Sequence, residues 1–392
     1  MGELWSLREL GDVGVSVHDC EHKTPVDAGH GYPYIAIPNI IDGRLDLTKT
    51  RKITLGDLRL WNRRVEPKLG DIILTRRGRV GDSAVIPSGI RCAMGQNLVL
   101  LRSDGSILDQ RYLRWAVRGP LWYAEVDRVL NVGAVFSSLN VRDIPRMKIP
   151  VPPLKSQREI SNTLSALDDK IAVNERVVST CDELRALSLQ GYLETAEATQ
   201  KVPLSSVADF INGRAFTKDA TGTGRMVVRI AEINSGPGAS TVYNDIDVPD
   251  QHVAHPGDIL FAWSGSLTVA RWYRPEAIIN QHIFKVLPKT GMPTWLAFEL
   301  TRAKLDDFRL IAAGKATTMG HIQRRHLDEP VLAPTEGDIG RLDEELGPLW
   351  DRALIAEQEN LALAELRDTL LPRLMSGELR VREAEGIVGG AL

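Results

Sequence analysis

Cysteine is scarce in this chain of 392 residues, and the three that occur, Cys20, Cys92 and Cys181, lie far apart. None of them forms a Cys-x-x-Cys pair, the spacing typical of zinc ribbons and redox motifs. An odd and scattered set excludes a disulfide framework, argues against a zinc site and is typical of a reducing compartment. We therefore expect a cytoplasmic protein that holds no metal.

Long apolar runs are missing as well, since none approaches the roughly 18 residues that a membrane span requires. The N-terminal residues MGELWSLREL have neither the basic start nor the apolar stretch of a signal peptide. With 43% apolar and 25% charged residues, the composition is that of a folded protein. The length predicts about two to four domains and no association with a membrane.

Motifs of nucleotide chemistry are absent too. The chain has no GxxxxGK[ST] phosphate loop and no Asn/Asp-Pro-Pro-aromatic motif, and Gly222-Thr223-Gly224 lacks the spacing of a dinucleotide loop. The stretch Asp19-Cys20-Glu21-His22-Lys23 contains the Glu-x-Lys of some metal-dependent nucleases, but no partner carboxylate precedes it. We therefore expect no catalytic residue and no cofactor in this chain.

Charge is unevenly distributed along the chain. Residues 1–150 carry 22 lysines and arginines against 17 aspartates and glutamates, and residues 201–333 carry 15 against 13. Residues 151–200 and 334–392 are acidic, with 5 against 8 and 6 against 13. Basic blocks are suited to phosphates and acidic blocks to solvent or a protein partner, although an excess as small as that of residues 201–333 is also common without meaning.

The chain has two similar halves. Residues 70–74, GDIIL, recur as residues 257–261, GDILF, and residues 95–100 are echoed by residues 280–285. Upstream, residues 34–40 match residues 227–233, and the openings at residues 5–7 and 202–204 correspond. Four matches in the same order predict a duplicated fold of short strands, with a helix near Leu108–Arg118 in one half and near Thr294–Phe308 in the other.

A proline-rich junction, residues 149–153 or 330–334, ends each half, and a long helical pattern follows it. Spacings of 4 and 3 predict a heptad seam, which continues through Cys181, Leu184 and Leu187 in the first helix, while Gly347-Pro348 predicts a kink in the second. Because each helix alone exposes an apolar stripe, we expect the two to pair. The residues expected to pair the helices or to dock partners are Ile160, Leu164, Leu167, Ile171, Asn174, Val178, Leu346, Leu349, Trp350, Leu354 and Leu361.

Residues 149–160, IPVPPLKSQREI, with residues 164–171, LSALDDKI, resemble the central conserved region of type I restriction–modification specificity (S) subunits. Residues 370–379, LLPRLMSGEL, are similar to the second conserved region of that family. The second junction departs from the pattern, because residues 334–338, PTEGD, lack the Gln-Arg pair. Together with the duplicated layout, the resemblance covers essentially the whole chain.

The resemblance implies an α+β fold with two similar globular α/β target recognition domains. Two long antiparallel coiled-coil helices separate the domains, and the whole forms a pseudo-twofold internal repeat. The expected boundaries are 1–153 for the first recognition domain, 154–199 for the first helix, 200–334 for the second domain, 335–380 for the second helix and 381–392 for a flexible tail.

The resemblance also implies a non-catalytic role. Members of the family read a bipartite, interrupted target in double-stranded DNA, and their helices set the spacing and dock two methyltransferase (M) subunits, to which restriction (R) subunits add. S-adenosylmethionine, ATP and magnesium are expected on those partners and not on this chain. Two alternatives stay open: a helical protein-binding scaffold without sequence-specific DNA recognition, and a stand-alone DNA-modifying enzyme with motifs not recognised here.

Residues that would contact DNA were sought in the turns that follow the repeated strands. Residues 75–81 place three arginines in a glycine-bounded loop, and the equivalent residues 262–266 offer an aromatic ring and two hydroxyls. The alternative for residues 75–81 is a solvated turn. The alternative for Gln96, Asn97, Gln281 and His282 is that they hydrogen-bond to backbone groups where a strand begins. The candidates are Arg76, Arg77, Arg79, Gln96, Asn97, Ser137, Trp263, Ser264, Ser266, Gln281, His282, Lys315 and Thr317.

Overall fold

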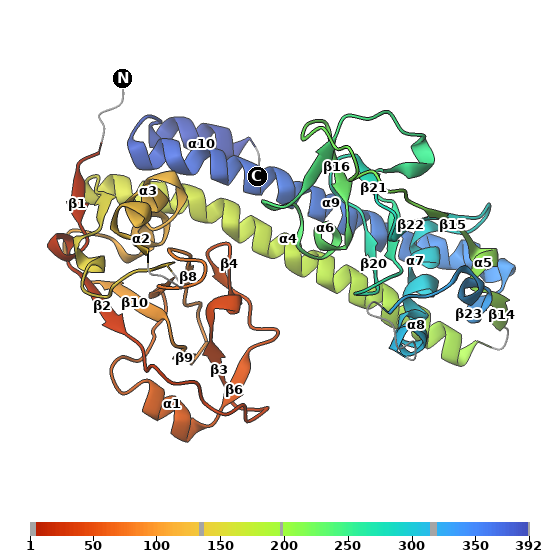
Figure 1. Ribbon diagram of the computed structural model, residues 1–392, viewed down its shortest axis with the longest axis horizontal. Helices are drawn as coiled ribbons and strands as arrows, with labels where there is room; N and C mark the ends of the chain where they lie inside the picture. The colour runs from red at the N-terminus through yellow and green to blue at the C-terminus, as the bar shows by residue number, and fades with distance from the viewer. Residues whose placement is uncertain (1–4, 133–136, 197–198, 314–319, 391–392) are drawn as a thin grey trace. The chain divides into compact units, whose positions relative to one another are not determined.

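The computed structural model describes residues 5–132, 137–196, 199–313 and 320–390 (Figure 1). The chain divides into two compact units: unit 1 is Met1–Lys170 with Leu363–Leu392, and unit 2 is Ile171–Ala362. Both units combine β-sheets with helices, so the predicted α+β class is confirmed. The candidates Lys315 and Thr317 lie outside the described residues.

The main sheet of each unit has four strands in the same order, with all neighbours antiparallel. In unit 1 the order is β2 (Val15–Asp19), β10 (Leu98–Ser103), β7 (Ile72–Thr75) and β8 (Ser83–Val85). In unit 2 it is β15 (Ala208–Asn212), β22 (Ile283–Pro288), β19 (Ile259–Ala262) and β20 (Thr268–Arg271). The two central strands are buried and mainly apolar because both faces of the sheet are covered, and the buried Lys285 of β22 is paired with Asp258 at 2.8 Å.

A second sheet repeats in the same way, and in both units it contains one parallel pair. Unit 1 has β6 (Arg51–Ile53), β3 (Tyr32–Ile35) and β9 (Ala93–Met94). Unit 2 has β17 (Val242–Asn244), β16 (Arg225–Val228), β21 (Ala277–Ile279) and β18 (Val253–Ala254). The predicted duplication is therefore confirmed at the level of strand order and direction.

The first and last strands of each half also pair, which closes the globular part before the long helix begins. In unit 1 these are β1 (Leu7–Glu9) with β13 (Lys148–Pro150), and in unit 2 they are β14 (Thr199–Pro203) with β23 (Pro330–Pro334). Unit 1 has two further short pairs, β4 (Ile40–Ile41) with β5 (Arg44–Leu45) and β11 (Asn131–Val132) with β12 (Ser137–Ser138).

Short helices complete the units. The helix expected near Leu108–Arg118 is α2 (Gln110–Ala116), which α3 (Gly119–Val129) follows, whereas the range expected as one helix in the second half, Thr294–Phe308, contains α7 (Thr294–Ala303) and the start of α8 (Leu305–Ala313). Val117 is the C-cap of α2 in unit 1, and Lys304 is the C-cap of α7 in unit 2. The remaining short helices are α1 (Leu55–Trp61), α5 (Leu204–Val207) and α6 (Ile230–Ser235).

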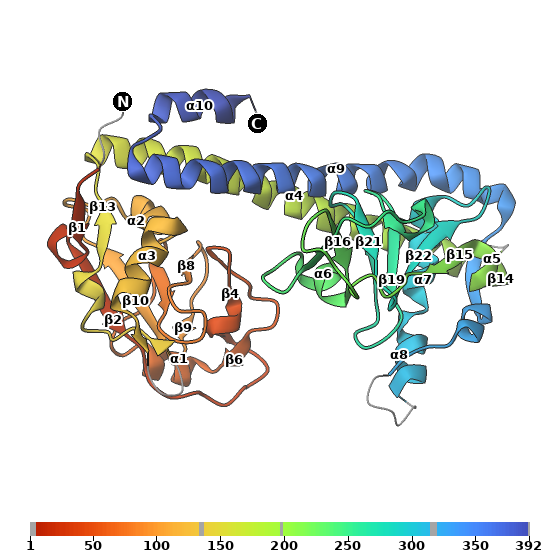
Figure 2. The ribbon, with the colours of Figure 1, turned by 45° about the horizontal axis from the view of Figure 1, so that its top comes forward.

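The two long helices are α4 (Leu154–Thr195) and α9 (Glu336–Ser376), and in each unit they lie side by side (Figure 2). In unit 1, Asp168 pairs with Arg367 at 2.9 Å. In unit 2, Asn174 donates to Glu359 at 2.7 Å, and Arg341 lies 5.7 Å from the ring of Tyr192. Because residue numbers on α9 fall as those on α4 rise, the helices are antiparallel. Helix α9 continues without a break through Gly347 and Pro348.

The expected heptad seam holds for only part of α4. Leu184 and Leu187 are 49% and 65% exposed, whereas Arg185 is 0% exposed and occupies the buried position between them. The expectation that these two leucines face α9 is therefore wrong. Of the named helix residues, the buried ones are Ile160, Leu164, Leu167, Ile171, Asn174, Leu346 and Trp350, and the half-buried ones are Val178, Leu349, Leu354 and Leu361.

The segment expected to be a flexible tail differs from the structure. Residues Val381–Gly389 form helix α10, and its Ala384 and Val388 are buried in unit 1. Gly377, with φ 80°, lets the chain turn at the end of α9 before α10 begins. Two small apolar residues four positions apart, Ala384 and Val388, are too weak a pattern to predict so short a helix from the sequence.

A buried ionic cluster joins the helices to the globular part of unit 1. The side chain of Asp168 on α4 is only 3% exposed and pairs with Arg367 on α9 and with Arg114 on α2. Arg44, after β4, lies 3.6 Å from the same carboxylate. Burial alone would raise the pKa of Asp168, but the three guanidinium groups outweigh burial and lower that pKa.

We predict that Asp168→Asn destabilises unit 1 by about 3 kcal/mol, because it leaves two buried arginines without their shared anion. Since the folded-state pKa of Asp168 is lowered, its contribution is complete above about pH 4 and is lost as pH falls through the folded-state pKa. Urea unfolding measured between about pH 3 and 7 should therefore show a weaker acid dependence in the variant. Asp169→Asn, at the exposed neighbour, is the control; an equal loss in both variants would contradict the prediction.

Candidate nucleic-acid interface

Three loop segments converge at one end of the main sheet in unit 1, and we call this place the recognition edge. The backbone N–H of Arg76, just after β7, donates to the carbonyl of Asn97 at 2.8 Å. The N–H of Leu139 donates to the carbonyl of Arg76 at 3.0 Å, and Arg77 bridges to Ser138. Segments that are far apart in sequence are thus tied into one frame by backbone atoms alone.

Unit 2 builds the same recognition edge from equivalent segments. The N–H of Trp263, just after β19, donates to the carbonyl of His282 at 3.2 Å. The N–H of Ile322 donates to the carbonyl of Trp263 at 3.2 Å, and Ser264 bridges to His321. Arg76 therefore corresponds to Trp263, and Asn97 corresponds to His282, as the sequence alignment of the halves predicts.

The three arginines of the unit 1 loop have different surroundings. Gly78 and Gly81 have φ of 71° and 90°, which lets the loop turn sharply beyond β7. Arg76 is half-buried; one of its nitrogens donates to the carbonyl of Leu139 at 3.2 Å, and another lies 3.7 Å from Asp19. Arg77 is exposed, and its side chain has no hydrogen bond or ion pair with any residue that the structure describes.

Arg79 is bound to its own unit. Its guanidinium donates to the carbonyls of Ile37 and Ile40 at 2.8 and 2.5 Å and lies 3.4 Å from Asp82. These carbonyls flank the 3-10 turn Ile37–Asn39, so Arg79 holds that turn in place. Its role as a DNA contact, still a prediction, would require that it give up these bonds.

The remaining unit 1 candidates lie on the same edge. The Gln96 side chain is exposed, and the backbone N–H of Gln96 donates to the hydroxyl oxygen of Tyr34 at 3.2 Å. Asn97 has φ of 69°, a left-handed conformation that asparagine tolerates better than most residues. Ser137 is half-buried in β12, next to the residue that bridges to Arg77. Gln96 is thus the candidate here whose side chain is most open to a ligand.

The unit 2 edge is aromatic and contains histidine in place of arginine. The indole N–H of Trp263 donates to Asn212 at 2.9 Å, and its ring lies 5.5 Å from that of His282 and 6.4 Å from that of His321. The Ser264 hydroxyl is buried and has no partner among the described residues. Ser266 and Gln281 are exposed, and Gln281 lies 3.3 Å from the His282 ring nitrogen.

Sequence reasoning missed two neighbours of Trp263: His321, whose ring lies beside the indole, and Asn212, which accepts the indole N–H. Composition alone does not give the hydrogen-bond register that brings these two residues to Trp263. A signal was nevertheless present: the segment that returns to the sheet in unit 1 bonds at Ser138, and its counterpart bonds at His321.

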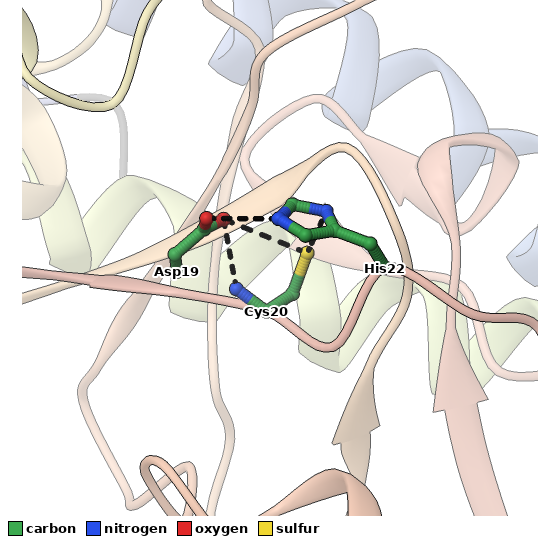
Figure 3. Close-up of side chains that lie close together, drawn as sticks. All are labelled: Asp19, Cys20 and His22. Atoms are coloured by element: carbon green, nitrogen blue, oxygen red, sulfur yellow. Dashed lines mark hydrogen bonds and ion pairs between the residues drawn. The ribbon is translucent and has the colours of Figure 1, made fainter.

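One cluster of metal-ligand type lies behind the unit 1 edge. Among the described residues, Asp19, Cys20 and His22 are the group of three whose ligand atoms lie within 4.8 Å of one another (Figure 3). Burial raises the pKa of the Cys20 thiol, so the group is a neutral thiol in the metal-free protein at pH 7. No second group of this kind occurs among the residues that the structure describes.

Comparison with known proteins shows which proteins the chain is similar to. Residues 2–179 match the family model described as the type I restriction modification DNA specificity domain. The first half of the chain is thus similar to type I specificity subunits, and the resemblance carried by residues 149–171, which lie inside the matched range, is confirmed.

Two relatives come from Methanocaldococcus jannaschii. The MjaIX type I restriction enzyme specificity subunit is 19% identical over 97% of this chain and 94% of its own length. A protein assigned as the MjaX specificity subunit is 26% identical over 45% of this chain, which spans only 42% of that relative. The type I restriction–modification S subunit of M. genitalium has the same fold, with a TM-score of 0.57, 14% identity and coverage of 95% and 96% of the two chains. In the described part of the chain, no helix is long and apolar enough to cross a membrane.

We predict that Arg79→Ala destabilises unit 1 by about 1 kcal/mol, because two backbone carbonyls lose a charged donor. Arg77→Ala should change the free energy of unfolding by less than about 0.5 kcal/mol, since its side chain is exposed and unpaired among the described residues. Urea unfolding of the two variants tests the difference. Equal stability of both variants would show that Arg79 has no structural role.

Proposed function

We propose that this chain is the DNA-recognition subunit of a type I restriction–modification complex and has no catalytic activity of its own. Each recognition edge contacts one half of a bipartite, interrupted target in double-stranded DNA. Methyltransferase subunits bind to the long helices, restriction subunits add to them, and S-adenosylmethionine, ATP and magnesium bind to those partners in the cytoplasm.

The observation that carries this proposal is the pair of recognition edges. Their backbone frames match bond for bond, yet Arg76 and Arg77 stand in one where Trp263 and Ser264 stand in the other. A protein that binds two identical sites has no use for this difference, whereas one that reads two different half-sites requires it. Arginine recognises guanine by two parallel hydrogen bonds, and an aromatic or hydroxyl side chain makes other contacts.

Selection from a random pool of DNA duplexes tests recognition directly. The chain with its M subunit should select one interrupted sequence with two fixed halves. Selection of no sequence, with the M subunit still bound, would favour the protein-binding scaffold. Methylation or cleavage by the isolated chain would favour the stand-alone enzyme.

Arg77 is the candidate best placed to contact DNA in unit 1. We predict that Arg77→Ala relaxes the selected sequence in one half-site only and weakens binding by about 1–3 kcal/mol if the contact with guanine is bidentate. Lys155→Ala removes the same charge from a side chain that is 86% exposed on α4 and serves as the control. Uniform weakening on every sequence by Arg77→Ala would show a phosphate contact instead.

An exposed apolar stripe on α4 supports the proposed binding of a partner. Val173, Leu184 and Leu187 are 48%, 49% and 65% exposed in unit 2. Val173 and Leu184 are 11 residues apart, which is about three helical turns, and Leu187 follows one turn later on the same face. We assign this stripe to helices of the methyltransferase subunit, because large apolar side chains aligned on one face are suited to a second helix.

We predict that Leu184→Lys with Leu187→Lys weakens binding of the M subunit at least tenfold, since each buried leucine contributes about 1.5–3 kcal/mol. Stability of the free chain should be unchanged, because both side chains face solvent. The control is Leu310→Lys on α8, at a leucine that is 73% exposed elsewhere in unit 2. Isothermal titration with the purified M subunit gives the affinities; unchanged binding by the double variant would exclude this stripe.

A further inference from the structure

Asp19, Cys20 and His22 bring three kinds of metal ligand together at the end of β2 (Figure 3). The Cys20 sulfur lies 4.0 Å from Nδ1 of His22 and 3.8 Å from Oδ1 of Asp19. The other ring nitrogen, Nε2 of His22, lies 3.0 Å from Oδ2 of Asp19. Ligand atoms around one zinc ion are about 3–4 Å apart, given metal–ligand distances of about 2.0–2.3 Å, so small side-chain rotations suffice to bind an ion.

The local fold holds these groups in place. Asp19 is the last residue of β2, opposite Val99 of β10, and its carboxylate accepts the backbone N–H of Cys20 at 3.0 Å. Cys20 is 2% exposed and packs in the core, whereas the His22 side chain is 52% exposed. Glu21 between them pairs with Arg63 at 2.8 Å and is directed to that partner. The cluster is thus anchored in the core and open to solvent at His22.

The donor set selects the kind of ion. One sulfur, one imidazole nitrogen and one carboxylate oxygen are the ligands that zinc accepts in tetrahedral sites, often with a water as the fourth ligand. Calcium and magnesium require oxygen ligands, which a thiol and an imidazole do not supply. The set therefore favours zinc and chemically similar ions such as cobalt(II).

We propose that Asp19, Cys20 and His22 bind one zinc-class divalent ion, with a fourth position open to solvent. Binding replaces the thiol proton of Cys20: the S–H bond breaks, the sulfur forms its bond to the metal, and the proton passes to solvent. Affinity therefore rises with pH.

The site has a consequence for the recognition edge, and this part rests on the proposed function. The Asp19 carboxylate that would bind the metal lies 3.7 Å from a guanidinium nitrogen of Arg76. A bound dication neutralises that carboxylate and repels the guanidinium, so Arg76 is released toward the edge. The added positive charge and the released arginine both strengthen contact with phosphates.

Cobalt(II) provides a direct test of the site in the full chain. Titration should produce a thiolate-to-cobalt charge-transfer absorption with a stoichiometry of about one ion per chain, and zinc should displace it. Cys20→Ser should abolish this absorption and weaken zinc binding at least tenfold. Cys92→Ser, at a second buried thiol of the same apolar core, should leave both unchanged and controls for folding.

His22→Gln, compared with His30→Gln at another exposed histidine of the same loop, tests the imidazole ligand. Zinc affinity should fall at least tenfold in the first variant and stay the same in the second. No thiolate absorption in the unaltered protein, or equal absorption in Cys20→Ser, overturns the metal site.

Zinc should also strengthen binding to the selected DNA severalfold, and Cys20→Ser should lose this effect. Metal binding that leaves DNA affinity unchanged overturns the link to Arg76 but supports the site. Failure of DNA binding with and without zinc counts against the proposed function alone, because the cobalt spectrum is measured without DNA.

Discussion

A buried arginine in each unit fixes how the long helices pack against the globular part. Arg185 and Arg367 are each the 32nd residue of their helix, counted from Leu154 and Glu336, and they are 0% and 2% exposed. A guanidinium that is removed from water requires compensating charge or an aromatic face. Sliding one helix past the other by a turn would remove both arginines from their partners. The register of the helix pair is thus specified by charge as well as by apolar packing.

The two arginines are compensated in different ways. Arg367 pairs with Asp168, the 15th residue of α4, and with Asp42 at 2.9 Å. The 15th residue of α9 is Trp350, whose ring lies 5.1 Å from the guanidinium of Arg185. The anions in unit 2 are Glu299 on α7, at 3.0 Å from Arg185, and Asp182 on α4 itself, at 2.8 Å. Equivalent positions therefore provide an ion pair in one unit and a cation–π contact in the other.

The pKa values of the two carboxylates, Asp168 and Glu299, are shifted in opposite directions. The pKa of Asp168 is lowered because three arginines outweigh its burial. The pKa of Glu299 is raised, because burial outweighs the attraction of Arg302 and Arg185. A lowered carboxyl pKa adds stability above the unfolded-state value, and a raised one subtracts stability there. The cluster of unit 1 therefore favours folding at neutral pH, whereas the burial of Glu299 in unit 2 reduces stability there and its ion pairs with Arg185 and Arg302 offset part of that cost.

Much of this architecture is readable from the sequence, because the repeat and the helices rest on local patterns. The Gly-Asp turns before β7 and β19 and the proline-rich junctions depend on backbone preferences of a few adjacent residues. Arg185 was missed because a charged residue inside a heptad pattern is normally solvent-facing, and only contacts with α7 and α9 bury it. Arg79 was expected to face DNA for the same reason: its partners, the carbonyls of Ile37 and Ile40, are about 40 residues away in sequence.

The recognition edges are built alike in the two units although the side chains that they display differ. Every bond that frames the edges runs between backbone groups: Arg76 to Asn97 in unit 1, and Trp263 to His282 in unit 2. Backbone bonds do not depend on side-chain identity, so the same frame presents a guanidinium in one unit and an indole in the other. Such a frame tolerates replacement of the side chains that it displays without loss of the fold. Under the proposed function, the specificity of each unit would be carried by the side chains that this frame displays, and the fold would constrain where contacts are made but not which bases they select.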